Sequence, residues 1–114
     1  KKYGKVWVVA PDGQRSAMSH RITLRETIEF FPVDFPVEGV HAYASTGTPA
    51  DCVRFGILNI VKEKPDYVFS GINYGYNSGT DIQYSATVGS ALEAACAGVH
   101  AIAFSEGASE CHEV

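Results

Sequence analysis

The sequence predicts an α/β protein with a mainly parallel sheet covered by helices on both faces, in three αβα layers. Short apolar runs without polar alternation are typical of strands buried on both sides. Segments with apolar residues at helical spacing lie between these runs, which indicates βαβ units. Two long polar loops follow strand ends, the place where open α/β sheets bind ligands.

Size and composition indicate one globular domain. The chain has 114 residues, of which 46% are hydrophobic and 19% charged. A net charge of −4 gives no reason to expect a nucleic-acid polymer as partner. No apolar stretch reaches the ~20 residues of a membrane span, and we expect no signal peptide. The cysteines Cys52, Cys96 and Cys111 form no C-x-x-C pair, which favours reduced thiols in a cytoplasmic protein over disulfides or a zinc site.

The first predicted strand is the apolar run of residues 6–10, which ends at a Pro-Asp-Gly turn signal. Residues 11–20, the first loop, are polar and small. Residues 22–31 alternate in part between apolar and polar side chains, which favours an extended excursion or a hairpin arm. Pro32 and Pro36 are expected to break that segment.

Residues 40–44 are the second predicted strand, and a helix follows. Thr48 suits the N-cap, Pro49 the first helical position, and the Asp51 carboxylate the positive end of the helix dipole. One apolar helical face then follows, and Pro65 prevents the helix from continuing. This face consists of Val53, Ile57, Ile60 and Val61.

Residues 67–69 are the third predicted strand and lead into the second loop, residues 70–87, which is rich in glycine. An alanine-rich amphipathic helix follows, with Gly98 in the position that commonly closes a helix. Residues 99–104 are the fourth predicted strand. The order of elements indicates one domain without internal repeats or linkers.

The two loops are expected to converge, because both leave the carboxyl ends of parallel strands. In the second loop, glycines allow backbone amides to approach an anion, and the following helix start offers further amides. Ser85 or Thr87 could cap that helix and contact a phosphate with the same hydroxyl. Plain turn glycines and cap hydroxyls explain the pattern about equally well, and no Walker A or dinucleotide fingerprint is present. The neighbours Ser19 and His20 are poorly placed as nucleophile and base, and Ser16 alone favours a turn serine.

Four motifs in register resemble a known family. They are Val-Val-Ala-Pro-Asp with a nearby Arg-Ser-Ala, Ser-Thr-Gly-Thr-Pro-Ala-Asp-Cys-Val at residues 45–53, Ser-Gly-Ile-Asn-Tyr-Gly-Tyr-Asn-Ser-Gly at residues 70–79, and Tyr-Ser-Ala-Thr-Val at residues 84–88. Together they resemble the SurE (stationary-phase survival protein) family over most of the chain. The resemblance implies a Rossmann-like fold and a metal-dependent hydrolase, a 5′/3′-nucleotidase that converts nucleoside monophosphates to nucleoside and phosphate.

The resemblance also implies roles for single residues. Ser16 matches a hydroxyl metal ligand and Asn73 an amide-oxygen metal ligand of the family. Asn77, Ser85 and Thr87 match positions that line its phosphate pocket. Oxygen ligands of this kind suit Mg²⁺ or Mn²⁺. No residue of this chain matches a catalytic position, and the resemblance implies a homodimer or homotetramer for the full-length parent.

The main departure from the family is an Asp-Asp pair, its principal metal ligands, which this sequence lacks. We therefore expect residues 1–114 to be the central part of a single domain, without the N-terminal strand-helix unit and the C-terminal region, and inactive alone. The alternative is a non-catalytic nucleotide- or phosphate-binding module. An Asp-Asp pair upstream of Lys1 would support the enzyme, and its absence would support the binding module. Base preference, 5′ or 3′ preference, polyphosphatase activity and the identity of the metal stay open.

Overall fold

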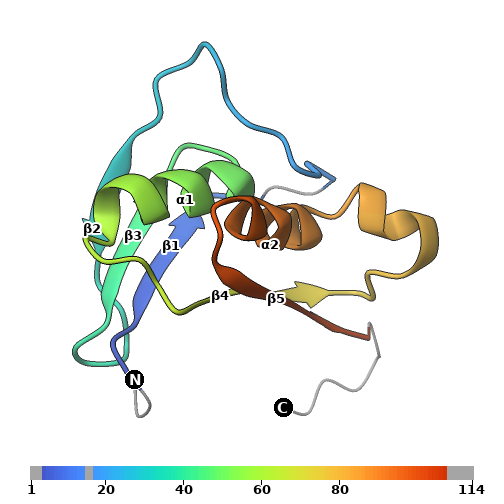
Figure 1. Cartoon of the computed structure of the whole chain (residues 1–114). Helices are drawn as coiled ribbons and strands as arrows, with labels where there is room; N and C mark the ends of the chain where they lie inside the picture. The colour runs from blue at the N-terminus through green and yellow to red at the C-terminus, as the bar shows by residue number, and fades with distance from the viewer. Residues whose placement is uncertain (1–3, 15–16, 108–114) are drawn as a thin grey trace.

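The computed structural model describes residues 4–14 and 17–107. Five strands, two α-helices and two irregular helical turns follow one another within these ranges (Figure 1). They are β1 (Trp7–Pro11), β2 (Phe30–Val33), β3 (His41–Ser45), α1 (Pro49–Phe55), η1 (Gly56–Ile60), β4 (Tyr67–Tyr74), η2 (Gly79–Gln83), α2 (Ala86–Cys96) and β5 (His100–Glu106).

The strands form two separate pieces of sheet. The first has the order β1-β3-β2, in which β1 runs parallel to β3 and β2 runs antiparallel to it. The second consists of β4 and β5, which run parallel to each other. The predicted α/β class with parallel pairing is confirmed. The described residues nevertheless form no continuous sheet, because no strand among them lies between β1 and β4.

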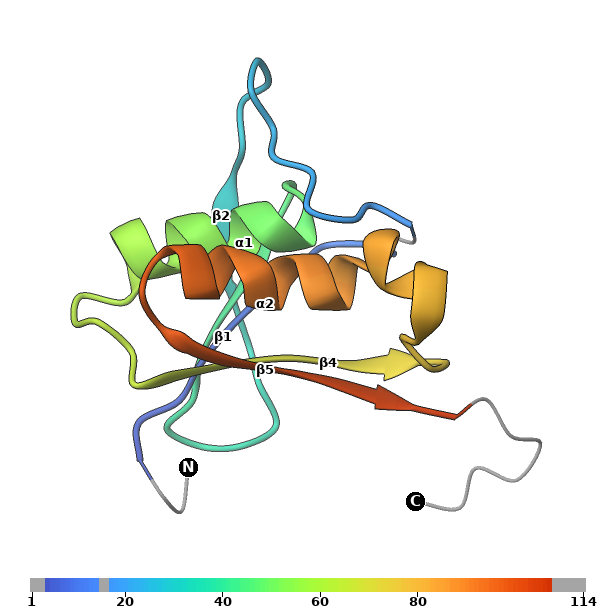
Figure 2. The ribbon, with the colours of Figure 1, turned by 45° about the vertical axis from the view of Figure 1, so that its right-hand side comes forward.

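Helices α1 and α2 pack against each other on the same side of the strands (Figure 2). Helix α1 packs on β1, and α2 packs on β4 and β5. The described residues therefore supply helices to one face only. Away from the helices, Tyr67 and Phe69 of β4 are exposed and stack with ring centroids 6.1 Å apart.

The excursion after the first loop differs from the prediction. Residues 21–29 form no strand, and the short strand β2 begins only at Phe30. Pro32 does not break it but lies inside it, opposite Tyr43 of β3, so that part of the prediction was wrong. The physical reason is that β2 is an edge strand, where one side has no neighbouring strand and a missing amide hydrogen costs no ladder bond.

Helix α1 begins as predicted. The Thr48 hydroxyl accepts from the Asp51 amide at 3.1 Å, and the Asp51 carboxylate accepts from the Thr48 amide at 2.9 Å, which forms a capping box. The α-helix proper ends at Phe55, and Gly56–Ile60 continue as a wider π-type turn. Local residues thus fix the start of the helix better than its end.

Helix α2 is the longest helix among residues 4–14 and 17–107. Ser85 is its N-cap and accepts from the Val88 amide at 3.2 Å. Gly98 follows the C-cap with a φ of 76°, as predicted for a glycine that closes a helix. No helix in the described part of the chain is long and apolar enough to cross a membrane.

Candidate functional site

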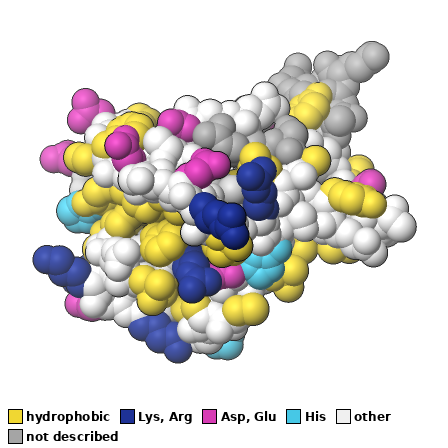
Figure 3. All heavy atoms as spheres, turned by 90° about the horizontal axis from the view of Figure 1, so that it is seen from above, with side chains coloured by type: hydrophobic (Ala, Val, Ile, Leu, Met, Phe, Trp, Pro, Cys, Tyr) yellow, Lys and Arg dark blue, Asp and Glu magenta, His cyan; other side chains and the backbone are white. Residues whose placement is uncertain are grey.

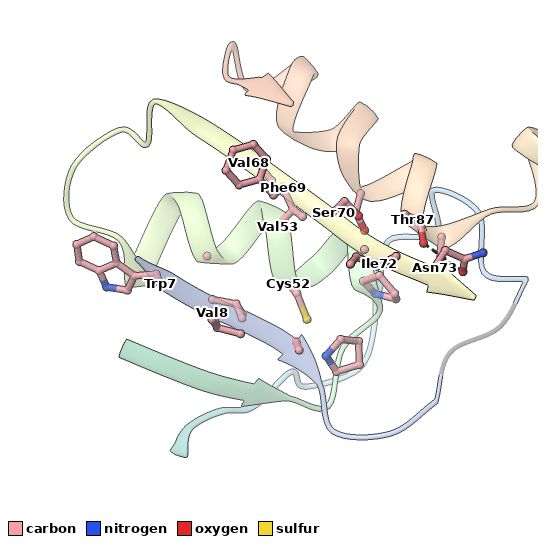
Figure 4. Close-up of a pocket in the computed structure, with 18 of the residues that line it drawn as sticks. Trp7, Val8, Cys52, Val53, Val68, Phe69, Ser70, Ile72, Asn73 and Thr87 are labelled. Carbon is pink, nitrogen blue, oxygen red and sulfur yellow. Dashed lines mark hydrogen bonds between the residues drawn. The ribbon is translucent and has the colours of Figure 1, made fainter. Parts of the chain in front are cut away.

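A cleft of about 1510 Å³ separates β1 from β4 (Figure 4). Apolar side chains line its length, among them Val8 of β1 and Val68 of β4. Polar residues gather where β4 ends. Among the residues that line this end from the two loops and α2 are Gly13, Gln14, Ala17, Asn73, Asn77, Asp81, Ser85 and Thr87. The predicted convergence of the two loops is therefore confirmed.

Asn73 lies near the end of β4 with a fixed side-chain amide. Its Nδ2 donates to the carbonyl of Gly75 at 2.9 Å and to that of Tyr74 at 3.3 Å. These bonds turn Oδ1 toward α2, where it accepts from the Thr87 hydroxyl at 3.4 Å (Figure 4). A strand end and a helix start thus place two oxygen-bearing side chains side by side at the cleft.

Asn77 is the second asparagine of this group. Its Nδ2 donates to the Ser105 hydroxyl at the end of β5. Ser105 was not among the site residues expected from the sequence. The sequence does contain an indication of this position. Ser105 is the first polar residue after an apolar predicted strand, which places it at the same edge of the sheet as the two loops.

The Ser85 hydroxyl can act as an acceptor and as a donor at the same time. Its oxygen accepts from the Val88 amide and so caps α2, while a hydroxyl that accepts still carries a hydrogen to donate. The N-terminal turn of α2 presents backbone amides without partners inside the helix, and the positive end of the helix dipole lies there. Because Ser85 and Thr87 both line the cleft, these donors lie at its polar end.

Ser16 and Asn73 are the two predicted metal ligands, and Ser16 lies outside the described residues. Asn73 offers one neutral oxygen, which suits a hard cation, and the exposed carboxylate of Asp81 also lines the cleft. Among residues 4–14 and 17–107, no three His, Cys, Asp or Glu side chains cluster in a way that could hold a metal ion. The described residues alone therefore do not complete a site for Mg²⁺ or Mn²⁺.

Asp51 is fully buried in the first turn of α1. Burial raises the pKa of its carboxyl group, but hydrogen bonds from Thr23 and Thr48 outweigh burial and lower the pKa below its usual value. The carboxylate is thus ionised at neutral pH. The predicted role of Asp51 at the start of α1 is confirmed, and the bonds to Thr23 add a contact that the sequence did not indicate.

The surface seen from above shows basic and acidic side chains interspersed with apolar ones (Figure 3). Several Lys and Arg side chains lie near the middle of this view, and most Asp and Glu side chains lie toward one side of it. The cleft, with its polar end at the two loops, is the candidate for a ligand site.

Comparisons with known proteins agree with this geometry. The sequence model of the family described as "Survival protein SurE" matches residues 1–113. The chain is 52% identical over 101 residues to a 5'-nucleotidase SurE of Thermoanaerobacter sp. (strain X514), covering 89% of this chain and 40% of the relative. It is also 52% identical over 104 residues to a 5'-nucleotidase SurE of Thermosipho melanesiensis, covering 91% of this chain and 40% of that relative.

A solved structure is similar as well. The crystal structure of SurE protein from Aquifex aeolicus matches with a TM-score of 0.80 and 41% sequence identity, over 96% of this chain and 43% of that one. The chain thus spans about 40% of the length of the curated relatives that it matches.

Proposed function

The chain belongs to the SurE family, and from that premise we propose that the full-length protein is a phosphatase that hydrolyses nucleoside monophosphates to nucleoside and phosphate, a 5′/3′-nucleotidase. Relatives about half identical to this chain carry the name 5'-nucleotidase SurE. The observation that carries the proposal is the polar end of the cleft. There Asn73, Asn77 and Thr87 surround the start of α2, opposite the first loop.

In this proposal the phosphate group binds at the N-terminus of α2. Backbone amides of the first turn and the hydroxyls of Ser85 and Thr87 donate to phosphate oxygens, a common way to bind phosphate without base recognition. Asn77 contributes its side-chain amide and is held in place by Ser105.

The proposed cofactor is a divalent cation, Mg²⁺ or Mn²⁺, with Asn73 and Ser16 as two of its ligands. When bound, such an ion polarises the phosphoryl group and lowers the pKa of a coordinated water. The donor chemistry of Asn73 supports this role, because its Oδ1 is turned toward the cleft by two bonds from Nδ2. In this proposal an Asp-Asp pair, which residues 1–114 lack, supplies the carboxylate ligands from further polypeptide.

In the same proposal, residues 1–114 are the central part of a single SurE-like α/β domain. The facing strands β1 and β4, separated by a mostly apolar cleft, support the idea that further polypeptide completes the sheet. We expect the full-length protein to form a homodimer or homotetramer. Free thiols at Cys52 and Cys96 suit a reducing compartment, so the proposed location is the cytoplasm, with neither membrane nor nucleic-acid polymer as partner.

The test is phosphate release from nucleoside monophosphates by the full-length protein. We expect release that requires Mn²⁺ or Mg²⁺, stops with EDTA and returns when excess metal is added. Absence of metal-dependent release from every 5′- and 3′-nucleotide would contradict the proposal. Calorimetric binding of a nucleoside monophosphate without turnover would then favour the alternative, a non-catalytic nucleotide-binding module.

A further inference from the structure

Residues 19–23, here called the clamp segment, connect the starts of both helices. They include the end of the first loop, whose Gly13, Gln14 and Ala17 line the polar end of the cleft. The clamp segment contains no helix or strand. Its position must therefore come from bonds to other elements, and the structure shows such bonds at each of its two ends.

At the α1 end, the clamp segment is bound by a buried carboxylate. Asp51 Oδ1 accepts from the Thr23 amide at 3.0 Å, and Oδ2 accepts from the Thr23 hydroxyl at 2.6 Å. The Thr48 hydroxyl donates to the Arg21 carbonyl at 2.5 Å. Hydrogen bonds to an ionised, buried acceptor are the stronger kind and are costly to leave unmade.

At the α2 end, the clamp segment touches the turn that precedes the phosphate-facing helix start. The Ser19 amide donates to the Tyr84 carbonyl at 3.1 Å, and the Ser19 hydroxyl donates to the Gln83 carbonyl at 2.6 Å. His20 contacts Glu93 of α2 with 2.5 Å between Nε2 and Oε2. These contacts place the end of the first loop directly against the start of the second helix.

Gly89 makes this approach possible. A Cβ atom at position 89 would lie 2.2 Å from the Ser19 carbonyl oxygen and 2.9 Å from the His20 nitrogen. Both neighbours are backbone atoms, so they could not turn aside as a side chain can. Any larger residue at position 89 therefore pushes the clamp segment away from α2.

We propose that Asp51 is a positioning residue for the phosphatase site. Its carboxylate holds Thr23 and, through the clamp segment, sets the distance between the first loop and the start of α2. Asp51 itself does not line the polar end of the cleft. The role in catalysis rests on the proposed function, whereas the mechanical role of the clamp does not.

The first experiment measures the clamp without substrate, by residue-resolved amide hydrogen exchange on the full-length protein. Thr23→Val removes the hydroxyl donor to Asp51 and is expected to speed exchange of the Ser19 amide about tenfold or more, as expected for loss of a bond to a charged acceptor. Thr23→Ser restores the donor and should restore protection. Thr27→Val, at an exposed position, is the matched control. Unchanged Ser19 exchange in Thr23→Val would overturn the proposal.

The second experiment measures phosphate release by the full-length protein at a temperature where every variant is folded. Thr23→Val and Gly89→Ala act at opposite ends of the clamp segment, and both should lower kcat/KM about tenfold or more. Thr23→Ser and Thr27→Val should stay within about twofold of the parent. A lower Tm with unchanged kcat/KM would show that the clamp is only structural. If the parent itself releases no phosphate, the proposed function fails while the exchange result still decides whether the clamp exists.

Discussion

Asn73 and Asp51 illustrate how two side-chain oxygens acquire different tasks from their surroundings. Asn73 is half-buried at the cleft, and its amide hydrogens are used by two backbone carbonyls, so its oxygen is the group left to face Thr87. Asp51 is fully buried, and its two oxygens accept from Thr23 and Thr48. The oxygen of Asn73 therefore lies at the cleft, whereas the oxygens of Asp51 are used inside the protein.

Replacement of Asn73 by Ala is expected to lower metal-dependent phosphate release of the full-length protein. Loss of a ligand should cost at least as much as loss of an outer-shell partner, about 10–100-fold in metal affinity or activity. Higher Mn²⁺ concentration should recover part of the activity. Asn59→Ala is the matched control, because Asn59 is exposed and does not line the cleft. Equal turnover in both variants would remove Asn73 from the proposed site.

Asp51 should make stability depend on pH in the acid range. Because its pKa is lower in the folded state, its contribution is present above the pKa of the unfolded state and is lost as pH falls through the folded value. At pH 7, Asp51→Asn is expected to lower the free energy of unfolding by about 1.5–3 kcal/mol. In acid this difference should shrink. Urea unfolding at a series of pH values measures it, and a difference that does not change with pH would contradict this reading.

At the scale of single elements, the sequence predicted those features that depend on residues close together in the chain. The starts of α1 and α2 follow from Thr48 and Ser85, whose hydroxyls act on amides within the same turn. The glycine-rich second loop at the end of β4 was predicted for the same reason. Strand β2 was not predicted, because it exists through pairing with β3. The clamp segment was not predicted either, because its bonds to the two helix starts join residues 27 or more positions apart.

Ser85→Ala should destabilise α2 by about 1 kcal/mol, the usual contribution of a serine N-cap. Ser78→Ala is the control, since Ser78 holds the corresponding position before η2 without a side-chain capping bond. Urea unfolding of both variants measures the difference. In the full-length protein Ser85→Ala should also weaken binding of inorganic phosphate, and equal effects of the two variants would argue against a special role for Ser85.

At the scale of the whole molecule, the two pieces of sheet face each other across the cleft, and Figure 4 shows β1 and β4 running in the same direction. The Val6 carbonyl accepts from His41, and the Asp12 amide donates to Ser45, so backbone groups of even-numbered residues in β1 face β3. Those of Trp7 and Val9 consequently point toward the cleft. No local sequence pattern could reveal this, because it depends on which strands become neighbours.

A strand supplied by polypeptide outside residues 1–114 should protect these backbone groups. We expect the Trp7 and Val9 amides to exchange quickly in this chain and slowly in the full-length protein. The Val8 amide, which faces β3, should be protected in both and serves as the internal control. Exchange of Trp7 and Val9 that is equally fast in the full-length protein would mean that the cleft stays open there.

The facing strands also bear on how the isolated chain behaves in a test tube. Neither β1, Trp-Val-Val-Ala-Pro, nor β4, Tyr-Val-Phe-Ser-Gly-Ile-Asn-Tyr, contains a charged residue. Uncharged strand edges whose backbone N–H and C=O groups have no neighbouring strand can pair with strand edges of other molecules. Charged residues at such edges normally prevent this pairing. Aggregation of the isolated chain should therefore rise with protein concentration through edge-to-edge pairing, in spite of a net charge of −4.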